Sequence, residues 1–327
     1  MRFSTSVLAT VLAASSAIAD TFDLRLMSYN IRYATSELEA QEKPWADRLP
    51  LMTAQLNHET AGRPGSLMCF QEALYQQAED LRNGLGKNNW DYIGVGRDDG
   101  AKAGEMSPIF YQPSAWELLD NKTYWLSETP DTPGSKGWDA SLPRIVTVGK
   151  FEHIKTGSDF VFMCTHYDYK GQVAQVQSSD LIVNLTSEWA DGAAPVFLGG
   201  DLNATPDSEA YKILASKLND VDNVIPKDRH YGYKNTYTGF NEDPADDSVI
   251  DHLFVKDSKS VEWVSFAVPN NRAGDGTFIS DHRPLIVDVK VPFKKNDKEE
   301  SRTLNLNAEG EARLELIRGR SRIVVSL

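Results

Sequence analysis

The sequence predicts an α/β protein in which two mixed β-sheets pack face to face and helices cover their outer faces. Two observations carry this prediction. Residues 20–292 contain no linker, repeat or low-complexity stretch, which favours one large domain. Along these residues, segments typical of strands and of helices follow one another in mixed order, with several strands in succession.

The predicted strands are short apolar runs, several of which end in glycine or in polar residues. They cover Leu24–Asn30, Leu67–Phe70, Trp90–Val95, Ser107–Tyr111, Ile145–Phe151, Asp159–His166, Val196–Gly200, Val249–Val255 and Leu285–Val291. Longer segments with apolar residues at helical spacing predict the helices. These are Trp45–Asn57, Leu74–Leu85, Val173–Ala190 and Ser208–Leu218.

The N-terminal segment, residues 1–19, is typical of a secretory signal peptide. Arg2 supplies a positive charge, residues 7–12 are mostly apolar, and Ala17-Ile18-Ala19 matches a small-x-small cleavage site. No later segment has the length and apolarity of a membrane span. We therefore expect a secreted, extracellular protein without stable membrane insertion.

The composition changes beyond residue 292. Residues 294–300 are mostly charged, and residues 303–325 then alternate apolar and polar side chains, which favours a β-hairpin. We expect residues 293–327 to form a charged linker and a hairpin-like extension that carries no chemistry.

Charge and cysteine content limit the function classes. The formal net charge is −13, which disfavours loose, sequence-independent binding to polyanions such as duplex DNA. Cys69 and Cys164 both lie in apolar strand-like runs, so we expect buried thiols, with a bridge between neighbouring strands as the alternative. Asn121 and Asn184 begin sequons for N-glycosylation.

The most informative motif is Asp201-Leu202-Asn203, which follows the apolar run Val196–Gly200. Side chains alternate along a strand, so Asp201 and Asn203 point the same way. A carboxylate that takes a proton from water, beside an amide that orients the water, is half of a hydrolytic site. Further polar clusters flank other predicted strands: Tyr29-Asn30, Gln71-Glu72, Thr165–Asp168, Asp251-His252 and Ser280–His282.

Taken in order, these clusters resemble the endonuclease/exonuclease/phosphatase superfamily of deoxyribonuclease-I-like enzymes. The resemblance covers residues 21–292, and the ordered set is far more specific than any single motif. It implies a four-layer α/β sandwich, which agrees with the elements predicted above. It also implies hydrolysis of phosphoric esters with Mg²⁺, or with Mn²⁺ as the alternative ion. The segment from Trp125 to Arg144 resembles an uncharacterised secreted subgroup.

The resemblance assigns a metal-binding role to three residues. Glu72 is similar to the principal Mg²⁺ ligand of the family, and a single carboxylate with several retained waters suits Mg²⁺. Asn30 is expected beside it, and Asp281 in or near the water shell of the metal.

The same resemblance assigns the proton transfer and the phosphate contacts. Asp201 is similar to the base that activates the attacking water, and Asn203 to the residue that fixes phosphate or nucleophile. His282 is expected to contact the scissile phosphate while Asp251 holds its imidazole.

His166 resembles a second histidine of the family. In deoxyribonuclease-I-like enzymes, that histidine is supported by a glutamate that precedes a strand. Glu105 has this place here, so we predict a hydrogen bond between Glu105 and His166. Asp168 lies on the same strand face as His166, and Arg144 follows Leu-Pro nearby. We predict substrate contacts for both.

Other residues are expected to serve the fold. Packing and capping are predicted for Arg48, and His252 should face away from Asp251 on a regular strand. Tyr124 and Trp125 belong to an aromatic-rich loop region, where stacking on a substrate and loop packing both remain open.

The function implied by the resemblance is that of a secreted, Mg²⁺-dependent phosphoesterase that hydrolyses a phosphodiester with water activated by Asp201. A nuclease is the leading class, with 3′–5′ exoribonuclease action implied by poly(A)-removing relatives. The alternatives are a phosphatase or phosphodiesterase acting on a phospholipid, an inositol phosphate or a phosphorylated glycan and, more remotely, an inactive binding domain. The expected partner is a phosphodiester or phosphomonoester substrate, nucleic acid included; no protein partner is indicated.

Overall fold

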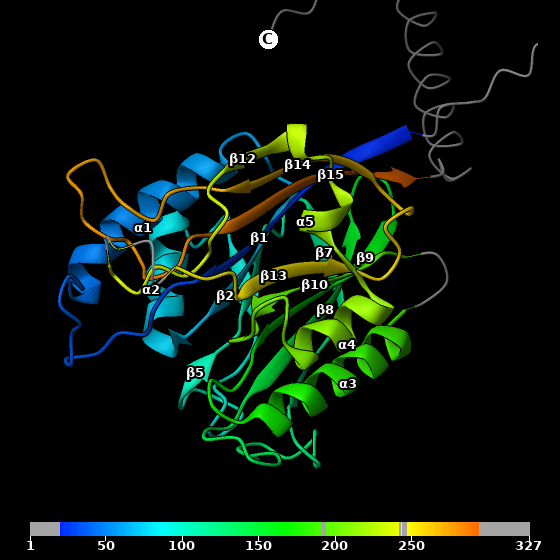
Figure 1. The fold of residues 1–327 in the computed structure, drawn as a ribbon. Helices are drawn as coiled ribbons and strands as arrows, with labels where there is room; N and C mark the ends of the chain where they lie inside the picture. The colour runs from blue at the N-terminus through cyan, green and yellow to red at the C-terminus, as the bar shows by residue number, and fades with distance from the viewer. Residues whose placement is uncertain (1–19, 191–193, 242, 244–246, 294–327) are drawn as a thin grey trace, which may run out of the picture.

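Two β-sheets lie face to face at the centre of the molecule (Figure 1). The structure is a computed structural model that describes residues 20–190, 194–241, 243 and 247–293. The predicted signal peptide and the predicted hairpin beyond residue 293 lie outside these residues. Within them, no helix is long and apolar enough to span a membrane.

Both sheets are mixed, and they form separate hydrogen-bonded ladders. The seven-stranded sheet has the order β12 (His230–Gly232), β14 (Glu262–Val268), β15 (Leu285–Phe293), β1 (Asp20–Asn30), β2 (Ser66–Gln71), β6 (Ile109–Tyr111) and β4 (Asp91–Ile93). The six-stranded sheet has the order β11 (Asn219–Asp220), β13 (Asp251–Val255), β10 (Val196–Asp201), β9 (Ser158–His166), β8 (Ile145–His153) and β7 (Trp116–Trp125). A short pair, β3 (Ala73–Leu74) and β5 (Glu105–Met106), stands apart.

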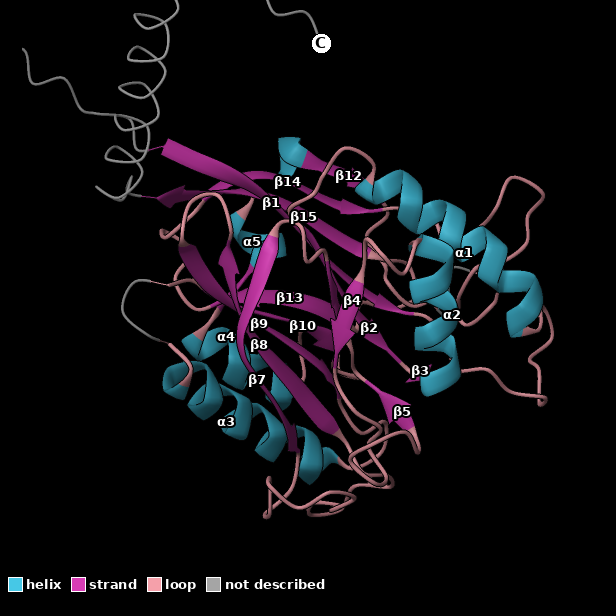
Figure 2. Cartoon of the chain, turned by 180° about the vertical axis from the view of Figure 1, so that it is seen from behind, coloured by secondary structure: helices cyan, strands magenta, loops and turns pink. Residues whose placement is uncertain are grey.

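Helices cover the outer face of each sheet (Figure 2). Helices α1 (Trp45–Thr60) and α2 (Tyr75–Leu85) lie on the seven-stranded sheet, and α3 (Gln172–Glu188) and α4 (Glu209–Lys217) lie on the six-stranded sheet. The short α5 (Val221–Val224) and a single 3₁₀ turn (Lys227–Arg229) connect β11 to β12. The predicted four-layer sandwich is confirmed.

The alternation of side chains along each central strand builds three apolar layers. In β2, Leu67 and Cys69 enter the core between the sheets, while Met68 and Phe70 enter the core beneath α1 and α2. The same period of two runs through β9 and β10. Strands buried on both faces are continuously apolar in sequence, which is why they could be recognised from the sequence.

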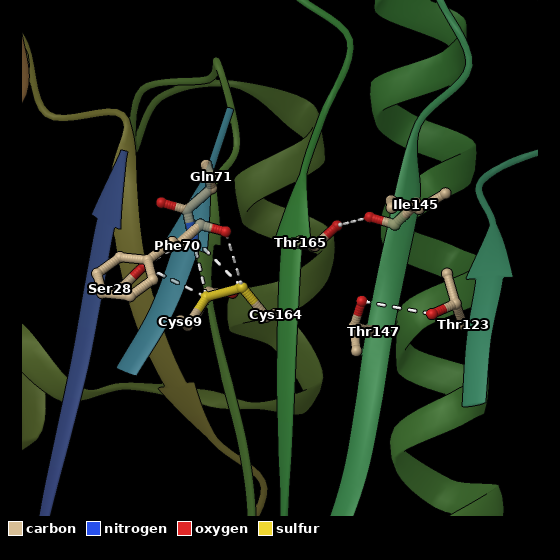
Figure 3. The surroundings of a disulfide bond; sticks show 10 residues. Ser28, Cys69, Phe70, Gln71, Thr123, Ile145, Thr147, Cys164 and Thr165 are labelled. Carbon is tan, nitrogen blue, oxygen red and sulfur yellow. Dashed lines mark hydrogen bonds between the residues drawn. A yellow bond between two sulfur atoms is a disulfide. The ribbon is translucent and has the colours of Figure 1, made fainter. Parts of the chain in front are cut away.

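A disulfide joins the two sheets through their shared core (Figure 3). It links Cys69 of β2 to Cys164 of β9, with a Cα–Cα distance of 5.3 Å. The expectation of two buried thiols is therefore wrong, and the alternative bridge joins facing sheets rather than neighbouring strands of one sheet. The pairing arises because both side chains point into the inter-sheet layer.

Two glycines allow close packing at the end of β10. A Cβ atom at Gly199 would lie 3.3 Å from Cβ of Ser28 on the facing sheet, and one at Gly200 would lie 2.5 Å from the carbonyl oxygen of Thr165. Larger side chains here would push β10 away from β1 and β9. Gly-Gly therefore brings Asp201, the next residue, close to the strand ends of both sheets.

Candidate active site

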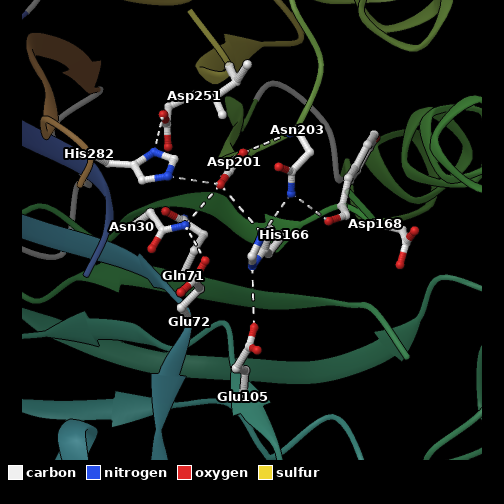
Figure 4. A network of polar contacts seen from close by, with 12 residues as sticks. Asn30, Gln71, Glu72, Glu105, His166, Asp168, Asp201, Asn203, Asp251 and His282 are labelled. Atoms are coloured by element: carbon white, nitrogen blue, oxygen red, sulfur yellow. Dashed lines mark hydrogen bonds and ion pairs between the residues drawn. The ribbon is translucent and has the colours of Figure 1, made fainter. Parts of the chain in front are cut away.

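The polar clusters predicted from the sequence meet at one end of the sandwich (Figure 4). β1 and β2 run parallel, as do β9 and β10, so Asn30 and Glu72 emerge beside each other and His166 pairs in register with Asp201. Antiparallel β13 adds Asp251 opposite Asp201. The site therefore draws its side chains from both sheets.

Asp201 lies at the centre of these side chains. Its Oδ2 accepts a hydrogen bond of 3.0 Å from Nδ2 of Asn30 and lies 3.5 Å from Nε2 of His166 and 3.7 Å from Nε2 of His282. Burial, and next the charge of Asp251, raises the pKa of Asp201 to about 7. The carboxyl group is thus able to exchange a proton near neutral pH.

His282 is held by the carboxylate of Asp251, as predicted. Nδ1 of His282 lies 2.8 Å from Oδ2 of Asp251. Burial alone would lower the pKa of His282, but Asp251 and then Asp201 outweigh it and raise this pKa to about 10. The ring is therefore an imidazolium whose Nε2 side faces Asp201.

Asn203 contacts His166, on the side of Asp201 opposite His282 (Figure 4). Nδ2 of Asn203 lies 3.0 Å from Nε2 of His166 and donates to the carbonyl of Tyr167 at 3.1 Å. Since an amide nitrogen only donates, Nε2 accepts and the ring proton is assigned to Nδ1. Burial, followed by the charges of Arg144 and Arg97, holds the pKa of His166 well below its usual value.

Glu105 lies beside His166 but makes no hydrogen bond with it. Oε2 of Glu105 is 3.6 Å from Nδ1 of His166, beyond hydrogen-bonding distance. The reason is that Arg97 holds the same oxygen at 2.7 Å, with Nη1 of Arg144 at 3.7 Å. The predicted neighbours are found, and the predicted hydrogen bond is wrong in this geometry.

Asp168 holds backbone rather than facing open space. Its Oδ2 accepts from the backbone N–H groups of Ser141 and Leu142, and its Oδ1 from those of Lys170 and Gly171, at 2.8–3.1 Å. Only 2% of Asp168 is exposed. The predicted substrate contact is therefore not one that this geometry offers, and Asp168 instead ties two loops at the edge of the site.

Replacing Asp168 by Asn is expected to destabilise the protein at pH 7 by about 1–3 kcal/mol, since an amide nitrogen cannot accept two of these bonds. Burial opposes ionisation, but the four N–H groups lower the pKa of Asp168. A carboxyl whose pKa is lowered by folding stabilises the fold above its unfolded pKa, about 3.9. That stabilisation is lost as pH falls through the folded value.

Urea unfolding of both proteins between pH 7 and pH 3 measures this effect. The difference between Asp168→Asn and the wild type should be largest at pH 7 and shrink in acid. The exposed Asp228→Asn serves as the control and should leave stability unchanged. A constant difference at every pH would contradict the role given to the carboxylate.

Arg144 is buried near the site with donors to spare. Its Nε and Nη1 have no hydrogen-bond partner among the described residues, and Nε lies 3.8 Å from Oδ2 of Asp168. Only 5% of Arg144 is exposed. The substrate contact predicted for Arg144 stays a prediction.

The acidic residues of the site fit a divalent cation. Carboxylate oxygens are the ligands that Mg²⁺ prefers. Burial raises the pKa of Asp281 to about 6. The charge of His282 opposes this shift, and the charge of Glu72 adds to it. Oδ1 of Asp251 is buried without a hydrogen-bond partner in the described part of the chain. The cluster therefore keeps at least one carboxylate oxygen that the described side chains leave unengaged.

Two sets of side chains compete as the cation site. One ligand atom from each of Asp201, Asp251 and His282 lies within 4.8 Å of the others. In that set, however, the His282 imidazolium is already the counter-ion of both carboxylates. The family resemblance instead assigns Glu72, Asn30 and Asp281, of which Glu72 and Asp281 offer carboxylates.

Asn30 links the carboxylates instead of offering them an oxygen. Its Nδ2 donates to Glu72 at 3.1 Å and to Asp201, while its Oδ1 accepts from the backbone N–H of Arg32 at 3.0 Å. In this orientation Asn30 would hold a metal ligand in place rather than be one. Glu72 itself directly follows β2 and has a φ of 61°, in the left-handed region that residues other than glycine seldom adopt.

Two arginines of the site region were not assigned a site role from the sequence. Arg97 holds Glu105, and Arg48 donates to the carbonyl of Ile31 at 2.8 Å and to that of Ile279 at 3.0 Å. Arg48 thus joins the end of β1 to the segment that carries Asp281. Neither arginine lies within a recognisable motif, so no local signal could have identified them.

Comparison with known proteins matches the chain to a family model and to solved structures. A model described as the Endonuclease/Exonuclease/phosphatase family matches residues 27–282. An endonuclease/exonuclease/phosphatase from Bacteroides vulgatus is 33% identical, with a TM-score of 0.75 and coverage of 83% of this chain and 99% of that chain. A mannosyl-6-phosphatase from Bacteroides thetaiotaomicron is 32% identical, with a TM-score of 0.72 and coverage of 81% and 99%.

A curated relative is an uncharacterized protein of Acanthamoeba polyphaga mimivirus. It is 22% identical over 321 residues, which make up 84% of this chain and 44% of the viral protein. The chain thus spans less than half the length of that relative.

Proposed function

The chain belongs to the endonuclease/exonuclease/phosphatase family and is a metal-dependent phosphoric ester hydrolase, and on this premise we propose that Asp201 and Asn203 position and activate the attacking water. The observation that carries the proposal is the position of Asp201, which lies within 4 Å of both His166 and His282. A base with a pKa of about 7 is well matched to proton transfer near neutral pH.

The other side chains divide the remaining work. The His282 imidazolium, held by Asp251, offers positive charge to the phosphate oxygens as charge develops on them. Asn203 offers its amide to the water or the phosphate. A divalent cation held by Glu72 and Asp281 would supply Lewis-acid stabilisation of the phosphoryl group.

We place a phosphorylated glycan ahead of nucleic acid as the substrate. The mannosyl-6-phosphatase matches over 99% of its own chain, and it carries most weight. Nucleic-acid binding depends on cationic side chains that contact successive phosphates. Here Arg97 and Arg144 face Glu105, and the net charge of the chain is −13.

A nuclease is the second candidate, with 3′–5′ exoribonuclease action as its specific form. Tyr169, three residues after His166, is half exposed, and such rings stack on bases without sequence preference.

We further propose that the enzyme is secreted, on the evidence of residues 1–19.

A substrate panel with the purified protein and Mg²⁺ tests the proposal. The panel holds mannose 6-phosphate, a mannosyl-6-phosphate oligosaccharide, single-stranded RNA, single-stranded DNA and bis(p-nitrophenyl) phosphate. We expect the phosphorylated glycan to be hydrolysed with the highest kcat/KM, and EDTA to lower every rate by at least about 100-fold because charge stabilisation is lost.

Glu72→Gln should raise the Mg²⁺ concentration needed for half-maximal rate, whereas the exposed Glu117→Gln should not. Faster cleavage of RNA or DNA than of the glycan would favour the second candidate. Full activity in EDTA would refute the metal site.

A further inference from the structure

His252 is a buried histidine beside the site that the proposed chemistry does not use. It follows Asp251 on β13, but its side chain lies on the opposite face of the strand, as predicted. There it packs against Tyr211 of α4, with the two ring centroids 4.8 Å apart. Only 3% of His252 is exposed. Burying an imidazole is unfavourable unless its nitrogens find partners, so these partners indicate what it does.

Both ring nitrogens of His252 face oxygen atoms. Nε2 lies 3.2 Å from the backbone oxygen of Ala204. Because a carbonyl oxygen only accepts, Nε2 must be the donor. Nδ1 lies 3.5 Å from Oδ2 of Asp220, the residue before α5. The imidazole thus donates to the Ala204 carbonyl on one side and lies beside the Asp220 carboxylate on the other.

Asp220 is itself fixed by two further hydrogen bonds. The hydroxyl of Tyr211 donates to its Oδ2 at 2.8 Å, and the backbone N–H of Asp222 donates to its Oδ1 at 2.9 Å. A carboxylate held at both oxygens cannot rotate away from the histidine. Asp220 therefore keeps a fixed place beside Nδ1 of His252.

Ala204 directly follows Asn203, and the turn between them is strained. Asn203 has a φ of 47°, in the left-handed region. Its backbone N–H donates to Oδ1 of Asp201 at 2.8 Å, and its carbonyl accepts from Nε2 of Gln175 at 3.1 Å. The turn is thus held by Gln175 on one carbonyl and by His252 on the next.

We propose that His252 is a positioning residue that holds the Asp201–Ala204 turn and thereby places Asp201 and Asn203 for attack on phosphorus. The inference rests on the proposed function only in taking these two residues to position the water. His252 acts through the Ala204 carbonyl and touches no reacting atom. Release of that carbonyl lets the strained turn relax, and displacement of reacting groups by about 1 Å costs on the order of 100-fold in rate.

The test compares two substitutions of the histidine. His252→Phe keeps an aromatic ring against Tyr211 and removes the donor to Ala204. We expect kcat for bis(p-nitrophenyl) phosphate to fall by about 10- to 100-fold, the loss typical of removing a residue that holds a site residue in place. KM should change by less than about twofold, because ground-state binding is untouched. His252→Gln, whose amide can donate to the same carbonyl, should recover most of the lost kcat.

Two further variants complete the design. His252→Met also removes the donor to Ala204 and should lower kcat in the same direction as His252→Phe. The exposed His58→Phe is the matched control, because it makes the same substitution on helix α1, which contributes no residue to the Asp201–Ala204 turn. Its kcat should stay within about threefold of the wild type. Thermal unfolding of each variant verifies that the protein is folded.

Several outcomes would overturn the inference. One is a wild-type kcat in folded His252→Phe, and another is a loss of kcat that His252→Gln does not reverse. If His252→Phe does not fold, His252→Met decides, and an unchanged kcat in that variant counts against the inference. An active Asp201→Asn would refute the proposed function itself. An inactive Asp201→Asn together with an unaffected His252→Phe would refute only the role of His252.

Discussion

Replacing Asp201 by Asn is expected to lower kcat for phosphoester hydrolysis by about 10³-fold, within the range found for a positioned base. The amide keeps an oxygen for the backbone N–H of Asn203, which Asp201 accepts at 2.8 Å, although its nitrogen cannot accept the bond that Asn30 donates to Oδ2. What is lost is the ability to take a proton from water. KM should change little, because Asp201 acts on the nucleophile rather than on the substrate. Steady-state kinetics with bis(p-nitrophenyl) phosphate and Mg²⁺ measure both constants.

The same substitution should leave the metal-free protein folded. Folding raises the pKa of Asp201 to about 7, because of burial and the nearby Asp251. An acid with a raised pKa opposes folding fully once pH exceeds that value, and the opposition fades as pH falls toward its unfolded pKa. Asp201→Asn removes this opposition, together with the acceptor for Asn30 and the counter-charge of His282, so the variant should remain folded at pH 8 in EDTA. The exposed Asp207→Asn is the control for activity, and a similar loss in that variant would argue against a specific role for Asp201.

Removing the disulfide is expected to lower the free energy of unfolding by about 4–5 kcal/mol, because the bond closes a very long loop in the unfolded chain. The sequence separation of Cys69 and Cys164 is 95 residues. The double variant Cys69→Ala, Cys164→Ala should show this loss in urea unfolding followed by tryptophan fluorescence. The wild type unfolded in dithiothreitol should show a loss of similar size.

Comparison of the two ways of opening the bond separates cross-linking from packing. The extra destabilisation of the double variant over the reduced wild type reports the volume removed from the core. Dithiothreitol should leave the double variant unaffected. Equal stability of the wild type with and without reductant would contradict a stabilising disulfide.

The buried strands were predictable from the sequence, whereas β7 and β14 were not. β2, β9 and β10 are apolar on both faces, so each is a continuous hydrophobic run. β7 is an edge strand whose middle is exposed and polar, so it shows no alternation, and its end was taken for a loop. β14 has an irregularity between Trp263 and Ser265 that interrupts the period of two.

Within the site, the predictions that depend on strand ends succeeded best. Asp251 and His282 form the predicted pair because β13 and the segment before β15 deliver them to the same place. Predictions that depend on a third residue failed, because such competition is not visible along the chain. Arg97 takes the oxygen of Glu105 that His166 was expected to share.

The composition of the site from both sheets has a consequence for the folding of the enzyme. Glu72 and Asn30 belong to one sheet, whereas His166, Asp201 and Asp251 belong to the other. A partly folded chain with only one sheet formed, or with both sheets formed but undocked, would hold half of the groups and no working centre. Enzymatic turnover in this protein therefore requires the closure of the layer between its sheets.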